Sequence, residues 1–271
     1  MMRSLWTGAS GMISQQTNVD TIANNLANIN TTGYKTERAE FKSLLYQTIQ
    51  DKSTDSTGEE KPIGIQVGLG TRNSAITSQF TQGAFTETGN QWDFAIQGDG
   101  FFAVQKSDGS IGYTRSGAFK MSIGVGGNTL CDSDGNPVLD SNGAPITTDA
   151  TYSPSQITVD ESGNLSYPDA DGNSQSLGIK IGLVQFNNPS GLSKGSGTTL
   201  KESAASGSPR WESGDTALSQ SVIKQKYLEG SNVQAVDEMV NLIVAQRAYE
   251  MNSKIITASD TMLQQANNLR N

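Results

Sequence analysis

Residues 232–269 read NVQAVDEMVNLIVAQRAYEMNSKIITASDTMLQQANNL, and their apolar side chains recur every three or four positions, with one polar gap at Gln265. They are Val233, Val236, Val240, Val244, Ala248, Met251, Ile255, Ala258, Met262 and Leu269. This spacing predicts one face of an α-helix. Such a helix would be roughly 55 Å long, well beyond an average globular helix. Ser231 or Asn232 is the expected N-cap, since Asp237 and Glu238 then lie in the first turns, where the helix dipole favours negative charge.

We call this apolar face the seam of the helix. A second helical seam lies at the other end of the chain. Between Ser4 and Asn28 the apolar residues recur every seven positions, at Leu5, Met12, Val19 and Leu26. The other positions are mostly Ser, Gln, Asn and Thr, which suits a helix packed on more than one side. We therefore predict two terminal helices that pair antiparallel.

Between the helices, short β-type runs alternate with turn signals. The runs are 93–97, 101–105, 155–159 and 179–186, and the turns are centred on 107–109, 134–136, 141–143, 162–164 and 171–173. Frequent turns of this kind predict antiparallel hairpins. Residues 91–200 hold 11 acidic and 5 basic residues, a balance of −6, so most of the net charge lies here. The predicted fold class is α+β, with a mainly antiparallel β middle.

The composition excludes several classes of function. The 271 residues include no histidine, which excludes Ser-His-Asp catalysis and the usual zinc sites. A net charge of −8 disfavours nucleic-acid binding. The single cysteine, Cys131, is interpreted as a small apolar filler. We find neither an apolar run of about 18 residues that would insert into a membrane nor the apolar core of a cleaved signal peptide.

Three motifs begin like ligand sites and then depart from the pattern. Residues 98–103, GDGFFA, match a dinucleotide fingerprint and follow a strand-like run, but they lead into another turn instead of a helix, so we predict a hairpin reversal there. The segments 132–136 and 169–173 begin like calcium loops, but Pro137 and Ser174 occupy the position that requires glycine. We predict ordinary turns, and neither a cofactor nor a metal site.

A carboxylate-dependent hydrolase stays open as an alternative, because that chemistry needs two acids and no histidine. Trp92-Asp93 and Trp211-Glu212 each place an acid beside an aromatic ring. Nothing in the sequence brings two carboxylates together on one face. We therefore predict that the protein is not an enzyme.

The two terminal helices indicate a role in assembly more strongly than the acids indicate catalysis. Asn24, Asn25 and Asn28 are costly if buried alone and useful if they hydrogen-bond to a neighbouring chain. Apolar seams at both ends would leave a monomer with a large exposed apolar face. These features predict a helical homo-oligomer that uses both seams as its interface.

Four blocks of sequence resemble one family. ANNLANINTTGYK (23–35), QGAFTETGNQWDFAIQGDGFFAV (82–104), YTRSGAF (113–119) and SNVQAVDEMVNLIVAQRAYEMNSKIITASDTML (231–263) are similar to the rod and hook proteins of the bacterial flagellum. The family motif includes Asn24, Asn25, Asn28, Gly33 and Tyr34. Within the family the chain is most similar to distal rod subunits, because of its length and of the polar segment 50–70. Proximal rod and hook subunits remain alternatives, as does a secreted β-rich adhesin.

The resemblance implies a layered subunit. Residues 1–32 with 231–271 would form an inner coiled-coil domain, 33–90 with 201–230 a connecting domain, and 91–200 an outer β domain. It also implies a hollow drive shaft that transmits torque and conducts exported subunits. The implied partners are other rod subunits, hook protein, the surrounding ring proteins and the flagellar type III export apparatus. Phe41 and Leu45 resemble an export-gate motif, with core packing as the alternative, and the implied location is the rod crossing the periplasm.

Overall fold

The computed structural model describes residues 2–50, 64–124, 127–149, 152–169, 173–215 and 217–269. They form two compact units. The helical unit comprises Met1–Ala27, Glu37–Ser78 and Gln234–Asn271, and the β unit comprises Asn28–Thr36 and Gln79–Val233. The chain therefore passes between the units at 27/28, 36/37, 78/79 and 233/234. These boundaries differ from those of the three-domain division, which stays a prediction.

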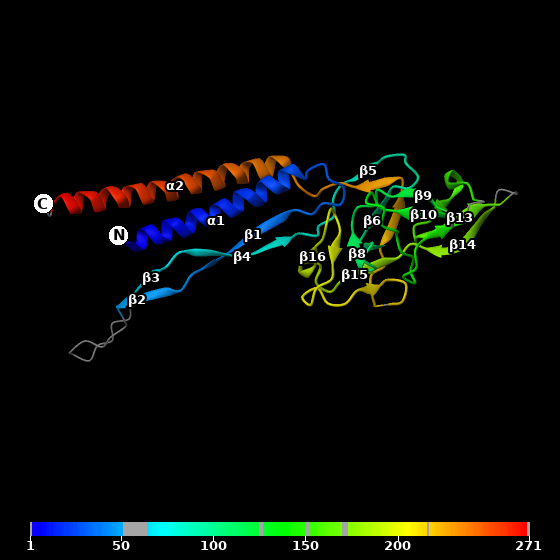
Figure 1. Cartoon of the computed structure of the whole chain (residues 1–271), viewed down its shortest axis with the longest axis horizontal. Helices are drawn as coiled ribbons and strands as arrows, with labels where there is room; N and C mark the ends of the chain where they lie inside the picture. The colour runs from blue at the N-terminus through cyan, green and yellow to red at the C-terminus, as the bar shows by residue number, and fades with distance from the viewer. Residues whose placement is uncertain are drawn as a thin grey trace. The chain divides into compact units, whose positions relative to one another are not determined.

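Two long helices lie side by side in the helical unit (Figure 1). They are α1, Met2–Ala27, and α2, Ala235–Asn268. The helices run antiparallel, because Ser4 Oγ near the start of α1 lies 3.1 Å from Ser259 Oγ near the end of α2. Both predicted helices and the α+β fold class are confirmed.

The start of α2 differs from the prediction. Its N-cap is Gln234, whose side chain makes no capping hydrogen bond, so a cap at Ser231 or Asn232 is wrong. The Asn232 side chain is engaged elsewhere, since its Oδ1 accepts hydrogen bonds from Thr36 N and Oγ1, both at 2.7 Å.

A long β-ribbon completes the helical unit. Its strands are β1 (Glu37–Ser43), β2 (Tyr46–Gln50), β3 (Ile65–Gly68) and β4 (Thr71–Ser78), paired antiparallel as β1–β4 and β2–β3.

The polar side of α1 binds this ribbon through hydroxyl groups. Ser14 Oγ lies 3.2 Å from Thr71 Oγ1, and Asn73 donates to Thr17 Oγ1 at 2.6 Å. These bonds explain why the first helix carries uncharged polar residues where a free amphipathic helix would carry charges.

The β unit is built from antiparallel sheets. The largest has the order β16-β17-β8-β7-β15-β18, and smaller ones have the orders β11-β10-β9, β12-β13-β14, β19-β6 and β20-β5. The strands are β5 (Phe85–Glu87), β6 (Phe94–Gln97), β7 (Phe101–Gln105), β8 (Ile111–Thr114), β9 (Lys120–Gly124), β10 (Gly127–Cys131), β11 (Thr147–Thr148), β12 (Thr158–Val159), β13 (Asn164–Pro168), β14 (Ser174–Lys180), β15 (Leu183–Gln185), β16 (Ser193–Lys194), β17 (Leu200–Lys201), β18 (Arg210–Trp211), β19 (Val222–Gln225) and β20 (Tyr227–Glu229). Two short 3₁₀ helices, η1 (Pro154–Gln156) and η2 (Pro189–Gly191), lie in its connections.

Two predicted features of the β middle need correction. The run 98–103 is not a hairpin, because β6 pairs with β19 while β7 pairs with β8 and β15. The run 155–159 contributes only the two-residue strand β12, because Pro154 starts a 3₁₀ turn in front of it. A turn rather than a helix follows β7, as expected, with Gly109 N donating to Lys106 O at 2.9 Å.

An aromatic core holds the β unit together. Phe94, Phe102 and Phe119 are at most 1% exposed, and the Phe102 and Phe119 rings pack edge to face at 5.0 Å. Cys131 is buried beside this core, and burial raises the pKa of its thiol. This thiol therefore behaves as the predicted small apolar group.

The tight turns are set by aspartate side chains, as the turn at Asp160 shows. Its Oδ1 accepts hydrogen bonds from Ser162 N at 3.0 Å and Asn164 N at 2.8 Å, while Gly163 supplies a φ of +84°. Burial raises the pKa of Asp160, but the hydrogen bonds from Asn164 and Ser162 outweigh it and hold that pKa below 3.8. The predicted turn at 171–173 lies partly outside the described residues.

Replacing Phe102 with alanine is expected to lower the free energy of unfolding of the β unit by about 3–5 kcal/mol, because it leaves a cavity in the aromatic core. Urea titration followed by tryptophan fluorescence measures this loss, since Trp92 and Trp211 lie in the β unit. Ile123→Ala is the control, because Ile123 is 83% exposed. Equal effects of the two variants would contradict the assigned core.

The free energy of unfolding is expected to fall as the pH drops below 3.8, because Asp160 has its pKa lowered by folding. Its contribution is present above the unfolded-state pKa and lost as the pH falls through the folded-state pKa. Asp160→Asn should cost less than about 1 kcal/mol at pH 7, since water screens this exposed carboxylate, and nothing at pH 2. A loss that is the same at both pH values would refute the role of the charge.

Candidate assembly site

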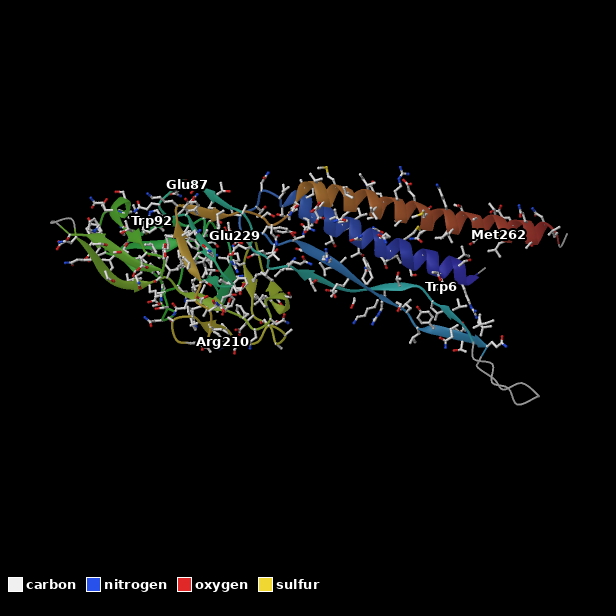
Figure 2. The ribbon with its side chains drawn as sticks, turned by 180° about the vertical axis from the view of Figure 1, so that it is seen from behind. Trp6, Glu87, Trp92, Arg210, Glu229 and Met262 are labelled. Atoms are coloured by element: carbon white, nitrogen blue, oxygen red, sulfur yellow. The ribbon has the colours of Figure 1, made fainter. Side chains whose placement is uncertain are left out.

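The helical unit displays most of the exposed apolar surface. Of the 22 large apolar side chains exposed among the described residues, 20 belong to this unit. Conversely, Ile22 and Ala245 are its only fully buried apolar side chains in the described part of the chain, against 22 in the β unit. Trp6 on α1 and Met262 on α2, labelled in Figure 2, are 74% and 55% exposed. The described residues of the helical unit therefore lack a core of their own.

The predicted seam of α2 does not face α1. Seven of its members are between 46% and 89% exposed: Val236, Val240, Val244, Met251, Ile255, Met262 and Leu269. The face toward α1 carries Asn252, Ile256 and Ser259 instead. Gly8 and Gly11 of α1 allow this approach, since a Cβ on either would lie within 3.1 Å of that face. The apolar seam is thus an uncovered surface rather than the joint between the helices.

The other predicted seam residues are at least partly covered, apart from Ala258, which is exposed. Leu5, Met12, Val19 and Leu26 of α1 are half-buried. Val233 is 8% exposed and belongs to the β unit.

Asn25 binds within its own chain, contrary to the expected bond to a neighbour. Its side-chain amide donates to Glu37 O at 2.8 Å, and its Oδ1 accepts from Glu37 N at 2.9 Å. Asn24 donates to Glu37 Oε1 at 3.4 Å, and Asn28 Oδ1 accepts from Thr31 Oγ1 at 3.0 Å. The asparagines therefore shape the exit of α1 and the start of β1.

Gly33 allows a close approach between backbones in the β unit. It has a φ of +70°, and a Cβ there would lie 2.5 Å from Ser116 N. Its N–H donates to Glu229 O at 2.9 Å. Tyr34 is half-buried and donates its N–H to Thr31 O at 3.3 Å. The family motif thus joins residues 28–36 to two distant segments.

A buried ionic group lies beside Gly33, and we call it the Glu229 cluster: Lys35, Gln82, Gly83, Arg115 and Glu229. Glu229 is 1% exposed, and its carboxylate meets Lys35 Nζ at 2.6 Å and Arg115 Nη1 at 3.3 Å. Figure 2 shows it within the β unit. Burial lowers the pKa of Lys35 and of Arg115, and the Glu229 charge opposes that fall. Sequence reasoning missed this cluster, whose members come from segments far apart in the chain.

The two residues of the proposed export motif are exposed. Phe41 lies on β1 at 39% exposure, and Leu45 follows that strand at 82%. Neither belongs to the buried core, so the packing alternative for this motif is not observed within one chain.

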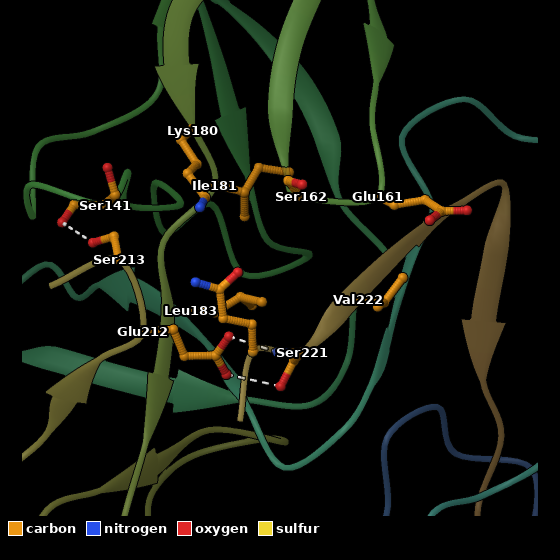
Figure 3. A pocket seen from close by; sticks show the side chains of 11 residues that line it. Ser141, Glu161, Ser162, Lys180, Ile181, Leu183, Glu212, Ser213, Ser221 and Val222 are labelled. Carbon is orange, nitrogen blue, oxygen red and sulfur yellow. Dashed lines mark hydrogen bonds between the residues drawn. The ribbon is translucent and has the colours of Figure 1, made fainter. Parts of the chain in front are cut away.

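A pocket of about 140 Å³ in the β unit contains two of the chain's acids (Figure 3). Glu212 accepts hydrogen bonds from Ser221 N at 2.9 Å, Ser221 Oγ at 2.8 Å and Gln185 Nε2 at 2.8 Å. The Glu161 side chain points away from Glu212 in Figure 3. Asp93 is engaged in the same way, by Thr88 and Asn90. Glu212 and Asp93 thus serve as acceptors for nearby donors, and Glu161 does not face Glu212.

The described residues contain no group of three side chains suited to hold a metal ion. Among those residues neither helix is long and apolar enough to cross a membrane.

Three segments match flagellar families. Residues 5–35 match the flagella basal body rod protein family, 95–167 the D1 domain of the flagellar hook proteins FlgE/F/G, and 224–269 the C-terminal region of the flagellar basal body rod proteins FlgEFG. Proteins named flagellar basal-body rod protein FlgG also align with almost the whole chain. Identity is 44% for that of Borreliella burgdorferi, over 100% of this chain and 99% of the relative. It is 42% for Agrobacterium fabrum (96% and 97%) and 39% for Bacillus subtilis (100% and 100%).

The chain belongs to the flagellar basal-body rod protein family. The resemblance inferred from the four sequence blocks is therefore confirmed. The matched segments 5–35 and 224–269 contain most of α1, all of α2, the asparagine motif and Glu229.

Gly33→Ala is expected to destabilise the β unit of this rod-family chain by about 3 kcal/mol or more, because a backbone clash adds to the strain of a positive φ. Gly89→Ala is the matched control, since Gly89 has a φ of +72° and nothing within 4 Å of its Cβ position. The control should lose only about 1 kcal/mol. Thermal unfolding measures both, and equal losses would show that residues 33 and 116 are not closely packed.

Proposed function

We propose that the protein is the structural subunit of the flagellar distal rod, and that its copies associate helically into a hollow tube. The observation that carries the proposal is the uncovered apolar seam of α2 in a unit without its own core. Each seam side chain would gain about 1 kcal/mol if a neighbour covered it, because roughly half of its surface is exposed. Repeated along a tube, this gain favours assembly of identical copies.

The layered organisation follows from this proposal. Residues 1–32 with 231–271 would line the axial channel as a coiled-coil layer, 33–90 with 201–230 would connect, and 91–200 would face outward. The polar segment 50–70 would contribute to a stiff, straight tube; its residues 51–63 lie outside the described residues. Torque would pass along the tube, and later export substrates would pass through it.

The proposed partners are further copies of the chain, other rod subunits, hook protein and the surrounding basal-body rings. The rod would cross the periplasm, and the subunit would reach it through the flagellar type III apparatus without signal cleavage. The exposure of Phe41 and Leu45 supports their role as the export-gate motif, because a recognition motif must be accessible.

We propose no catalytic role for the subunit. Family membership supports a structural role, and the paired acids needed by a hydrolase do not face each other in the pocket of Figure 3. The proximal rod and hook alternatives have less support, because the full-length relatives reported above are named FlgG. A secreted adhesin would not explain the apolar seams of the terminal helices.

Val244→Lys is expected to abolish rod assembly while changing the free energy of unfolding of the isolated subunit by less than about 0.5 kcal/mol, because Val244 is 61% exposed. Electron microscopy of purified basal bodies measures assembly. Ile123→Lys is the matched control, an exposed apolar residue of the β unit that should leave assembly intact. Normal rods from Val244→Lys subunits would refute the interface.

A further inference from the structure

Three segments that contain the β-unit ends of all four chain crossings meet at one place. Residues 28–36 hold two of these ends, residues 79–83 hold the third, and residues 229–233 hold the fourth. Gln79 N donates to Thr36 O at 2.8 Å, so the first two segments are joined directly.

Glu229 ties the three segments together through its own atoms. Its backbone oxygen accepts from Gly33 N, and its carboxylate accepts from Lys35 Nζ, Gln82 Nε2 at 2.6 Å and Gly83 N at 2.9 Å. Lys35 Nζ also donates to Thr81 O at 2.7 Å. Charge-assisted bonds of this kind, shielded from water, are strong and directional.

Asn232 makes a second tie between the same segments without any charge. Its Oδ1 accepts from Thr36 N and Oγ1, and its Nδ2 donates to Gln79 O at 2.9 Å and Thr81 Oγ1 at 2.7 Å. One side chain therefore holds the segment entering β1, the segment leaving β4 and the start of α2.

Arg115 anchors this group to the strands of the β unit. Besides Glu229, its guanidinium donates to Gly98 O at 2.7 Å and lies 5.1 Å from the centre of the Phe101 ring. Phe101 is fully buried and begins β7, in the middle of the largest sheet. The tied segments are thus fixed to the largest sheet of the unit.

We propose that Lys35, Arg115, Glu229 and Asn232 form a crossing clamp. It fixes the β-unit ends of all four crossings, so that force arriving through the helical unit enters the β unit at one rigid point. Without the clamp the force would bend the chain separately at each of the four crossings. This inference rests on the proposed role in the rod, where each subunit transmits torque.

Hydrogen exchange on the full soluble chain tests the clamp. Glu229→Gln is expected to raise exchange at 28–36, 79–83 and 230–233 together, by at least about tenfold, while residues 101–105 keep their protection. Asn232→Ala should raise exchange in the same segments without leaving a buried charge unpaired, and so tests the clamp even if Glu229→Gln fails to fold. Asp215→Asn is the control, because it breaks the partly exposed Arg210–Asp215 pair of the same unit and should act only near residues 208–215.

Two results would overturn the clamp: crossings that respond separately or not at all, or a loss of protection spread equally over the β unit, which would make Glu229 a group of general stability. Rods carrying Asn232→Ala should also show a shorter bending persistence length than wild-type rods, and unchanged stiffness would contradict the proposal. Failure of the wild-type chain to assemble would refute the rod function alone, since exchange in the monomer tests the clamp independently.

Discussion

Apolar burial is divided unequally between the two units, and the rest of the structure depends on this division. The β unit buries its aromatic rings and large aliphatic side chains within one chain, whereas the part of the helical unit that the structure describes fully buries only the apolar side chains of Ile22 and Ala245. Hydroxyl and amide groups hold α1 to its ribbon and to α2, and such bonds contribute only about 1 kcal/mol each. A unit stabilised in this way would gain further stability if a neighbouring copy covered its apolar surface, as we propose.

The terminal helices could be predicted because their pattern is local. Apolar residues spaced by three, four or seven positions define a helix whatever it packs against, and aspartate-glycine turns such as that at Asp160 carry their own hydrogen bonds. The antiparallel β middle followed from the same local signals. Pairing between strands was less predictable, since β6 joins β19, more than a hundred residues away.

The face of α2 that meets α1 could not be predicted from apolarity. The usual expectation is that an apolar stripe faces the nearest helix, but Gly8 and Gly11 let Asn252 and Ile256 approach closely. The apolar stripe is then left exposed. Likewise, Asn25 looked available to a neighbour because its partner, the backbone of Glu37, carries no sequence signal. The Glu229 cluster was hidden for the same reason: its charges are brought together only by the fold.

If neighbouring copies complete the core of the helical unit, hydrogen exchange should differ between the chain as a monomer and the same chain in purified rods. We expect fast exchange of residues 236–262 in the monomer and strong protection of them in the rod. Residues 101–105 should be protected in both. Equal, full protection of α2 in the monomer and in the rod would refute completion by neighbours, because it would show that one chain already supplies the missing core.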